Sequence, residues 1–364
     1  MSFIHIIYNL NYAYKTHIII TVIDLWEYLK NAKKPIVLYG MGNGADKIIS
    51  VLDSFGIKFN GVFATDGFVR DKYFHGFKLA TYSQLKEKFG NMIVLVCFGS
   101  ARPEVMENIK RIAAEQELYA PDVPVYGGGL FTRDYAKIHK TELEYVYGRL
   151  ADSLSRNTFE SIIKYKITGK PEYLFSCETD TDEPYRSFLN LSNSERFFDL
   201  GAYNGDTVSD FIKRTDGYGG ITAVEPDLKN FKKLSRFAED KSNICLVNAC
   251  ISDKCGVKSF SMHGGRNSAS GGEELIRSVT VDSLSEITPP TYIKMDIEGS
   301  ECEAIKGAEN TIKSFKPKML ISCYHRTEDL FALPIEVDKI RNDYKIYLRH
   351  FPSVPAWELN YYFI

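Results

Sequence analysis

The sequence is poor in cysteine patterns and in long apolar runs. Its seven cysteines are an odd number, and no two of them have the Cys-x-x-Cys spacing of a metal knuckle or redox motif. The apolar run His17–Val22 is short and is soon followed by Asp24, which is unlike a membrane span or a signal peptide. These absences favour reduced, buried thiols and a cytoplasmic location, and we expect no membrane span.

The chain also lacks an excess of charge of either sign. Its 45 Lys and Arg residues nearly balance 47 Asp and Glu residues, which gives a formal net charge of -2. Such a balance provides no basic field for nucleic acid and no acidic tail, so we expect no nucleic-acid partner. The remaining composition, 44% hydrophobic and 25% charged over 364 residues, is typical of a globular protein with about two domains.

A first strand–turn–helix pattern occurs at Pro35–Lys47, where a continuous apolar run leads into a glycine turn and an amphipathic helix. We therefore predict a small Rossmann-like α/β domain over residues 33–130, after a helical or strand lead-in over residues 1–32. Further strands of this domain are expected at 58–64, 91–98 and 123–126.

The glycine turn of this first domain has an incomplete nucleotide-binding pattern. It contains Gly40, Gly42 and Gly44, but Ala45 stands where the last glycine of a GxGxxG fingerprint would be. The turn indicates either a dinucleotide or nucleotide-sugar site completed by Asp66, or a scaffold or dimerisation role.

Residues 131–184 favour a helical connector that ends in the acidic, turn-rich stretch Cys177–Pro184. From residue 185 the alternation of strands and helices restarts and continues to residue 364. Strands are expected at 196–200, 221–224, 244–251, 292–295 and 318–323, helices at 228–238 and 302–315, and an inserted hairpin at 258–284.

The last two β-rich segments, 345–351 and 357–364, are separated by only a few residues. So short a link cannot contain a crossover helix, and the two strands must therefore be antiparallel. The sequence predicts an α/β fold whose second domain, residues 185–364, has a mostly parallel sheet with an antiparallel last strand.

The run FFDLGAYNGDT, Phe197–Thr207, places an acid, Asp199, at the end of a strand, before a turn bounded by Gly201 and Gly205. The turn lacks the Lys-Ser/Thr of a P-loop, and its acids would repel a pyrophosphate. A second acid, Glu225, ends the next strand, where a carboxylate can accept hydrogen bonds from ribose hydroxyls. These features favour a cationic ligand without phosphate, such as S-adenosylmethionine.

The motifs FFDLGAYNGDT, ITAVEPD, SVTVDSL and IKMDIEGSECEAIKGA, in this order, resemble those of the FkbM-type methyltransferases, a branch of the class I S-adenosylmethionine-dependent enzymes. The resemblance covers residues 185–364 and implies a class I methyltransferase Rossmann-like sheet. It also implies methyl transfer to a hydroxyl of a small molecule or sugar, such as a glycan or nucleotide-linked sugar.

The same resemblance implies which residues bind the cofactor. Those around its methionine part would be Asp199, Gly201, Asn204, Asp206 and Thr207. Glu225 would hold the ribose, and the adenine would lie by Asn248 and Ala249. Gly205 and Pro226 belong to the same turns and complete the expected site.

The candidates for the acceptor side follow the fourth and fifth strands. Asp296 and His325 are the candidate general bases, because a hydroxyl is a poor nucleophile near neutral pH. Lys294 is the expected partner of Asp296, and Glu298 is a further substrate-binding candidate. We weigh Mg²⁺ bound by the acids as an alternative and assign no metal ligand.

The loop Gly264–Gly272 is either a surface hairpin tip or a lid whose Arg266 and Asn267 bind the acceptor. Two other functions remain open: a nicotinamide-dependent sugar-modifying enzyme that uses the first domain, and a non-catalytic nucleotide- or S-adenosylmethionine-binding scaffold. A homo-oligomer formed through the first domain is also possible on this reasoning.

Overall fold

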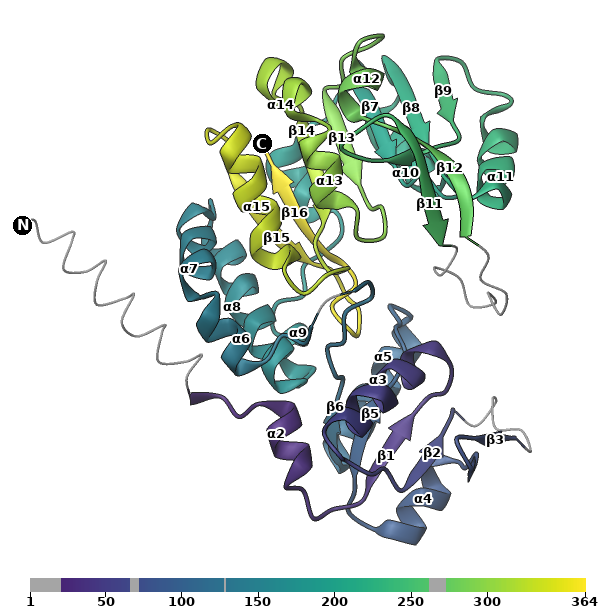
Figure 1. The fold of residues 1–364 in the computed structure, drawn as a ribbon, viewed down its shortest axis with the longest axis vertical. Coiled ribbons are helices and arrows are strands. Elements are labelled where there is room, and N and C mark those ends of the chain that lie inside the picture. The colour runs from purple at the N-terminus through teal and green to yellow at the C-terminus, as the bar shows by residue number, and fades with distance from the viewer. Residues whose placement is uncertain (1–20, 66–71, 128, 262–272) are drawn as a thin grey trace, which may run out of the picture.

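The computed structural model describes residues 21–65, 72–127, 129–261 and 273–364. They form a small α/β unit, a helical connector and a large α/β unit, which are the lower, left and upper parts of Figure 1. Within these ranges no helix is both long enough and apolar enough to cross a bilayer. Outside them lie Asp66, Arg266, Asn267 and the first 20 residues of the expected lead-in.

The small unit is built on a four-stranded parallel sheet with the order β2-β1-β5-β6. Its central strands are buried throughout, and α3 packs Ala45, Ile48 and Leu52 into the same core. Its elements are α2 Leu25–Lys30, β1 Ile36–Tyr39, α3 Asn43–Ser54, β2 Gly61–Phe63, β3 Tyr73–Phe74, β4 Phe77–Lys78, α4 Tyr82–Phe89, β5 Ile93–Val96, α5 Pro103–Glu115 and β6 Glu117–Tyr119.

One expected strand of this unit is wrong. The strand predicted at 123–126 is irregular backbone, and the fourth strand is β6, which lies earlier in the chain. Pro121 and Pro124 explain the difference, because a proline lacks the N–H that a strand needs for its ladder.

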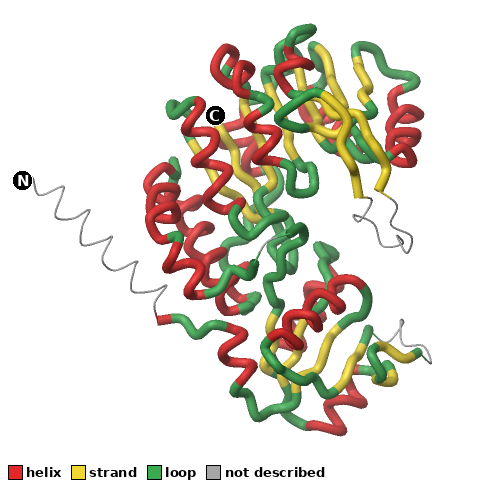
Figure 2. The backbone as a smooth tube through the Cα atoms, in the orientation of Figure 1, coloured by secondary structure: helices red, strands yellow, loops and turns green. Residues whose placement is uncertain are grey.

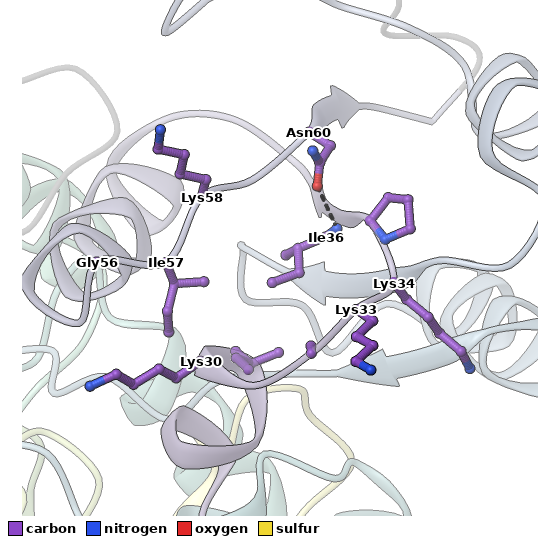
Figure 3. Close-up of a pocket in the computed structure, with 11 residues that line it drawn as sticks. Lys30, Lys33, Lys34, Ile36, Gly56, Ile57, Lys58 and Asn60 are labelled. Carbon is purple, nitrogen blue, oxygen red and sulfur yellow. Dashed lines mark hydrogen bonds between the residues drawn. The ribbon is translucent and has the colours of Figure 1, made fainter.

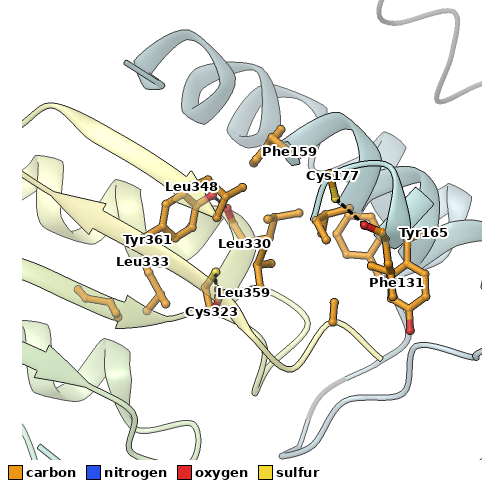
Figure 4. Close-up of a cluster of buried hydrophobic side chains, with 14 of the residues drawn as sticks. Phe131, Phe159, Tyr165, Cys177, Cys323, Leu330, Leu333, Leu348, Leu359 and Tyr361 are labelled. Carbon is orange, nitrogen blue, oxygen red and sulfur yellow. Dashed lines mark hydrogen bonds between the residues drawn. The ribbon is translucent and has the colours of Figure 1, made fainter. Parts of the chain in front are cut away.

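The connector is helical, with α6 Arg133–Ile138, α7 Lys140–Arg149, α8 Ser153–Thr168, α9 Glu172–Phe175 and the short π-helical turn η2 Tyr185–Leu189. Phe159 and Tyr165 of α8 join a buried cluster with Leu348, Leu359 and Tyr361 from the end of the chain (Figure 4). The connector therefore packs on the edge of the large sheet, which Figure 2 shows as the red helices on its left.

The large unit has a seven-stranded sheet with the order β15-β16-β14-β13-β7-β8-β9. β16 is antiparallel to both β14 and β15, whereas the other pairs are parallel. The prediction of a mostly parallel sheet with an antiparallel last strand is confirmed. The strands are β7 Arg196–Leu200, β8 Gly220–Val224, β9 Ile244–Val247, β13 Tyr292–Met295, β14 Lys318–Ser322, β15 Ile346–His350 and β16 Leu359–Phe363.

Helices flank this sheet on both faces (Figure 1), and two expected elements are divided. The strand expected at 244–251 is split into β9 and β10, and β10 Cys250–Ile251 joins the inserted strands β11 Gly256–Ser261 and β12 Glu273–Val279. The helix expected at 302–315 is broken at Gly307, whose backbone lies too close to Ser252 for any side chain. The helices are α10 Asp206–Thr215, α11 Leu228–Ala238, α12 Val281–Ser285, α13 Glu301–Lys306, α14 Glu309–Phe315 and α15 Asp329–Ile340.

Arg349 of β15 links the connector to the large sheet. Its side chain is 1% exposed and pairs with Asp152, the N-cap of α8, and with Glu183, each at 2.7 Å. It also donates a hydrogen bond to Ser155 Oγ at 2.8 Å. This buried cation is paired with two carboxylates, which would have no counter-charge if it were removed.

We expect Arg349→Ala to lower the free energy of unfolding by about 3–5 kcal/mol, because Asp152 and Glu183 would lose their buried cation. Urea unfolding followed by circular dichroism measures the change. Arg186→Ala is the control, because its pairs with Asp180 and Asp182 are exposed to solvent and contribute little to stability. Equal losses for the two variants would contradict the assignment.

Candidate functional site

A buried lysine links two neighbouring strands of the large sheet, β7 and β13. Lys294 of β13 is paired in register with Asp199 of β7, so the two side chains lie on the same face of the sheet. Its Nζ is 3.4 Å from Asp199 Oδ1 and 3.7 Å from Asp296 Oδ2, and it donates to the Gly201 carbonyl at 3.2 Å. The expected pairing of Lys294 with Asp296 is present, and Asp199 shares the same cation.

Asp199 is fully buried beneath the glycine turn. Burial, opposed by the attraction of Lys294, raises its pKa to about 6. Neither of its oxygens has a well-aligned hydrogen bond within the described residues, although Lys294 lies close. A buried carboxylate with spare acceptor capacity at this position can bind a ligand's donor group or orient the turn above it.

The turn after β7 can form only with glycine at Gly201. This residue has φ +87°, and a Cβ there would lie 2.0 Å from the Asp296 carbonyl oxygen. The turn then leads through Asn204, whose Oδ1 accepts from the Asp206 N–H at 3.2 Å. Thr207 lies in the first turn of α10, where its N–H donates to Asp206 Oδ1 at 2.8 Å. The N-cap is Gly205, at φ +91° and packed on Phe237.

Glu225, at the end of β8, holds this turn from the neighbouring strand. Its Oε2 accepts from the Tyr203 N–H at 2.8 Å, and its Oε1 accepts from the Asp227 N–H at 2.9 Å. Burial raises its pKa to about 7, against the effect of these two backbone donors. Each carboxylate oxygen keeps a second lone pair, so Glu225 can still accept hydrogen bonds from a diol.

The expected adenine side is formed by the loop after β9. Asn248 is exposed, and its Nδ2 donates to the Glu225 and Pro226 carbonyls at 2.8 and 3.1 Å. Ala249 is buried beside it. The residues expected around the cofactor therefore converge at the carboxyl edge of β7, β8 and β9 and are linked by hydrogen bonds.

Asp296 is the accessible carboxylate on the acceptor side. Its side chain is 34% exposed, whereas that of His325 is 1% exposed. The distance from His325 Nε2 to Asp296 Oδ1 is 3.5 Å. Tyr324 donates to Asp296 Oδ1 at 3.2 Å. Burial alone would raise the pKa of Asp296, but the charges of Lys294 and His325 hold it below its ordinary value.

His325 lies between two carboxylates. Its Nδ1 is 2.9 Å from Glu301 Oε1, and Glu301 is itself fully buried and accepts from the Ile297 N–H. Burial would lower the pKa of His325, but Glu301 and Asp296 raise it to about 9. The ring is therefore an imidazolium near neutral pH.

Asp296, Glu301 and His325 each have one donor atom within 4.8 Å of the others, as a metal site would require. The two ring nitrogens of His325 face different carboxylates, so one ion cannot replace both contacts. Mg²⁺ in addition prefers oxygen ligands and bound water to a buried imidazole. We interpret the cluster as an ion-paired network.

Two residues of this site, Tyr324 and Arg326, were not predicted from the sequence. Tyr324 and Arg326 flank His325 directly after β14, and that position at the carboxyl edge was the available signal. Arg326 donates from Nε to the Gly299 carbonyl at 2.6 Å and so fixes the loop that carries Glu298. Glu298 has φ +54° and an exposed side chain.

A cavity of about 360 Å³ lies elsewhere, at the amino ends of β1 and β2 in the small unit (Figure 3). Its lining includes Lys30, Lys33, Lys34 and Lys58, together with Asn60, whose Oδ1 accepts from the Ile36 N–H. This edge is opposite the one that carries the turn glycines, and the cavity contains none of the residues described above. We therefore place the functional site at the carboxyl edge of the large sheet.

Comparison with known proteins identifies related folds and a family match. None of the curated proteins matches the chain. The crystal structure of a methyltransferase FkbM from Methylobacillus flagellatus KT is similar over 91% of this chain and 90% of that one, with a TM-score of 0.71 and 24% identity, and shows that the fold is shared.

Two further structures cover 48% of this chain: precorrin-6y C5,15-methyltransferase from Geobacter metallireducens GS-15 and Aeropyrum pernix fibrillarin. The matches cover 81% and 67% of those two chains, with TM-scores of 0.31 and 0.32 and identities of 13% and 14%.

A family model matches part of the large unit. Residues 199–346 match the family model described as the methyltransferase FkbM domain. The large unit of this chain therefore contains an FkbM-type methyltransferase domain.

Proposed function

We propose that the protein is an S-adenosylmethionine-dependent O-methyltransferase that acts on a hydroxyl of a small molecule or sugar. The observation that carries this proposal is the acidic glycine turn between β7 and α10, which is held by Glu225 and lies over the buried Asp199. A turn with these acids disfavours phosphate and favours a ligand with a sulfonium and an ammonium group.

The described residues fit that cofactor. Gly201 and Gly205 have positive φ and let the turn pack tightly on Asp296 and Phe237, and Asp199 keeps unused acceptor capacity beneath the turn. Glu225 would accept from the ribose hydroxyls, and Asn248 would lie by the adenine. When bound, S-adenosylmethionine supplies an electrophilic methyl group on a positively charged sulfur.

We propose that Asp296 is the base that accepts the proton of the acceptor hydroxyl. Its carboxylate is accessible, whereas His325 is buried behind it and is protonated near neutral pH. His325 is thus a positioning residue that holds Asp296 in its charged form. The cations that lower the pKa of Asp296 also make it a weak base, so orientation of the acceptor supplies more of the rate than proton transfer does.

The nicotinamide alternative has less support. In the turn of the small unit, Ala45 stands where the last glycine of the fingerprint would be, and Gly40 packs on the Phe98 ring. Gly44 packs against the Cys97 carbonyl, which is a helix–strand packing role. Binding of NAD(H) without affinity for S-adenosylmethionine would favour this alternative.

We expect Glu225→Gln to weaken S-adenosylmethionine binding about tenfold in titration calorimetry, because an amide NH₂ would face a backbone N–H and offer one acceptor fewer. Asp210→Asn is the matched control. Asp210 is an exposed acid of α10 that pairs with Arg214 and lies outside the turn. Unchanged affinity in Glu225→Gln would overturn the cofactor assignment.

We also expect a defined pH profile. With Asp296 as the base, kcat falls as pH rises through the His325 pKa of about 9, because the imidazolium that orients Asp296 loses its proton. A neutral His325 acting as the base would give the opposite sign, a rate that climbs towards pH 9.

Variants separate the two roles. Asp296→Asn should lower kcat by about 10²–10⁴-fold with cofactor affinity retained. His325→Gln should lower kcat less and abolish the decline above pH 9. Wild-type turnover by Asp296→Asn would show that the base is elsewhere.

A further inference from the structure

The small unit touches the large one where the carboxyl ends of both sheets face each other (Figure 1). Ser100, just after β5, exchanges two backbone hydrogen bonds, at 2.8 and 3.0 Å, with Val354 in the connection between β15 and β16. The Trp357 ring lies directly on Gly99, where a Cβ would be 2.0 Å from the indole. The two edges are therefore in contact through specific residues.

A second contact involves the segment after β6. The Tyr126 N–H donates to the His325 carbonyl at 3.0 Å, and the Arg326 guanidinium lies 4.7 Å from the centroid of the Tyr126 ring. A Cβ on Gly299 would be 3.2 Å from Tyr126 Cβ. Tyr126 of the small unit therefore lies beside the loop that carries Glu298.

The antiparallel register of β14 and β16 brings a further acid to this edge. The Cys323 N–H donates to the Leu359 carbonyl, so the next residues outwards, Tyr324 and Glu358, are neighbours. Tyr324 bonds Asp296, and burial together with the negative charge of Asp296 raises the pKa of Glu358, so Glu358 lies near Asp296. Trp357, next to Glu358 in the chain, and Tyr126, beside the loop that carries Glu298, therefore lie at the same edge as Asp296.

This edge has the chemistry of a site for hydroxyl groups. Trp357 and Tyr126 are 40% and 48% exposed, so part of each ring stays open to a ligand beside the contacts of Trp357 with Gly99 and of Tyr126 with Arg326. Asp296, Glu298 and Glu358 offer several carboxylate oxygens that accept hydrogen bonds from O–H and N–H groups. These acids disfavour an anion, because the neighbouring cation Arg326 is already engaged by the Gly299 carbonyl and the Tyr126 ring. Lys47 of α3 is engaged by the Val125 carbonyl at 2.6 Å.

We propose that the loops of the small unit complete the acceptor site, and that Trp357 and Tyr126 hold a polyhydroxylated acceptor with no anionic group near Asp296. This inference rests on the proposed methyl transfer and adds the acceptor's class and the residues that contact it. A sugar with free or amino-substituted hydroxyl positions fits this site. A sugar phosphorylated next to the reacting hydroxyl does not.

Tryptophan fluorescence tests the proposal, because the sequence contains only Trp26 and Trp357. Trp26 is buried and stacks on Phe55, so Trp26→Phe leaves Trp357 as the single indole. We expect glucose or glucosamine, added in the presence of S-adenosylmethionine, to give a saturable change in emission, and glucose 6-phosphate to bind at least tenfold more weakly. If Trp26→Phe does not fold, the difference in sugar-induced emission between wild type and Trp357→Phe reports the contribution of Trp357.

A second substitution tests the contribution of the small unit. Tyr126→Ala should weaken sugar binding about tenfold without changing cofactor affinity, because one stacking face is lost. Tyr73→Ala is the matched control, since Tyr73 of β3 is 72% exposed on the small unit and makes none of the contacts described for Tyr126. Equal effects of the two substitutions would overturn the inference.

The outcomes also separate this inference from the function on which it rests. Normal cofactor binding without any saturable response to glucose or glucosamine overturns the acceptor proposal alone. Equal binding of glucose 6-phosphate overturns the charge argument and with it the proposed class of acceptor. Failure of the wild-type protein to bind S-adenosylmethionine overturns the proposed function itself.

Discussion

One buried ammonium group holds the site together. Lys294 lies between Asp199, under the cofactor turn, and Asp296, on the acceptor side, and it also binds the Gly201 carbonyl. A buried cation is costly unless it is paired, and here it has two carboxylates and a carbonyl. Because Lys294 contacts all three, the positions of the turn and of the candidate base are coupled. Gly201 reinforces this coupling, since its backbone touches that of Asp296.

The network continues from Asp296 into the interior. His325 bridges Asp296 and Glu301, and its charge offsets part of the negative charge that two neighbouring acids would otherwise concentrate. Alternating charges, Asp199, Lys294, Asp296, His325 and Glu301, thus run from the turn to the start of α13. Such a chain favours the ionised form of Asp296 and a single orientation of its carboxylate. It offsets the mutual repulsion of the acids that cluster at this edge.

The sequence was most informative where the local pattern and the tertiary environment agree. β7, α11 and β13 begin and end where they were predicted, because they are uninterrupted apolar or amphipathic runs bounded by acids and turn residues. The strand expected at 123–126 was wrong because apolar character was given more weight than Pro121 and Pro124. The position of Lys294 opposite Asp199 depends on the register of two strands almost a hundred residues apart, which no local pattern contains.

The acceptor-side residues were harder to find for the same reason. Glu358 reaches this edge through the antiparallel register of β16, and Tyr126 reaches it only because the small unit lies against the large one. The family match spans residues 199–346, so Tyr126 lies before it and Trp357 after it. If the cofactor turn and Asp296 perform the transfer, they can stay constant while these outlying loops change. Acceptor choice would then be set by the contact between the two units, and the small unit would have a catalytic purpose without binding a nucleotide of its own.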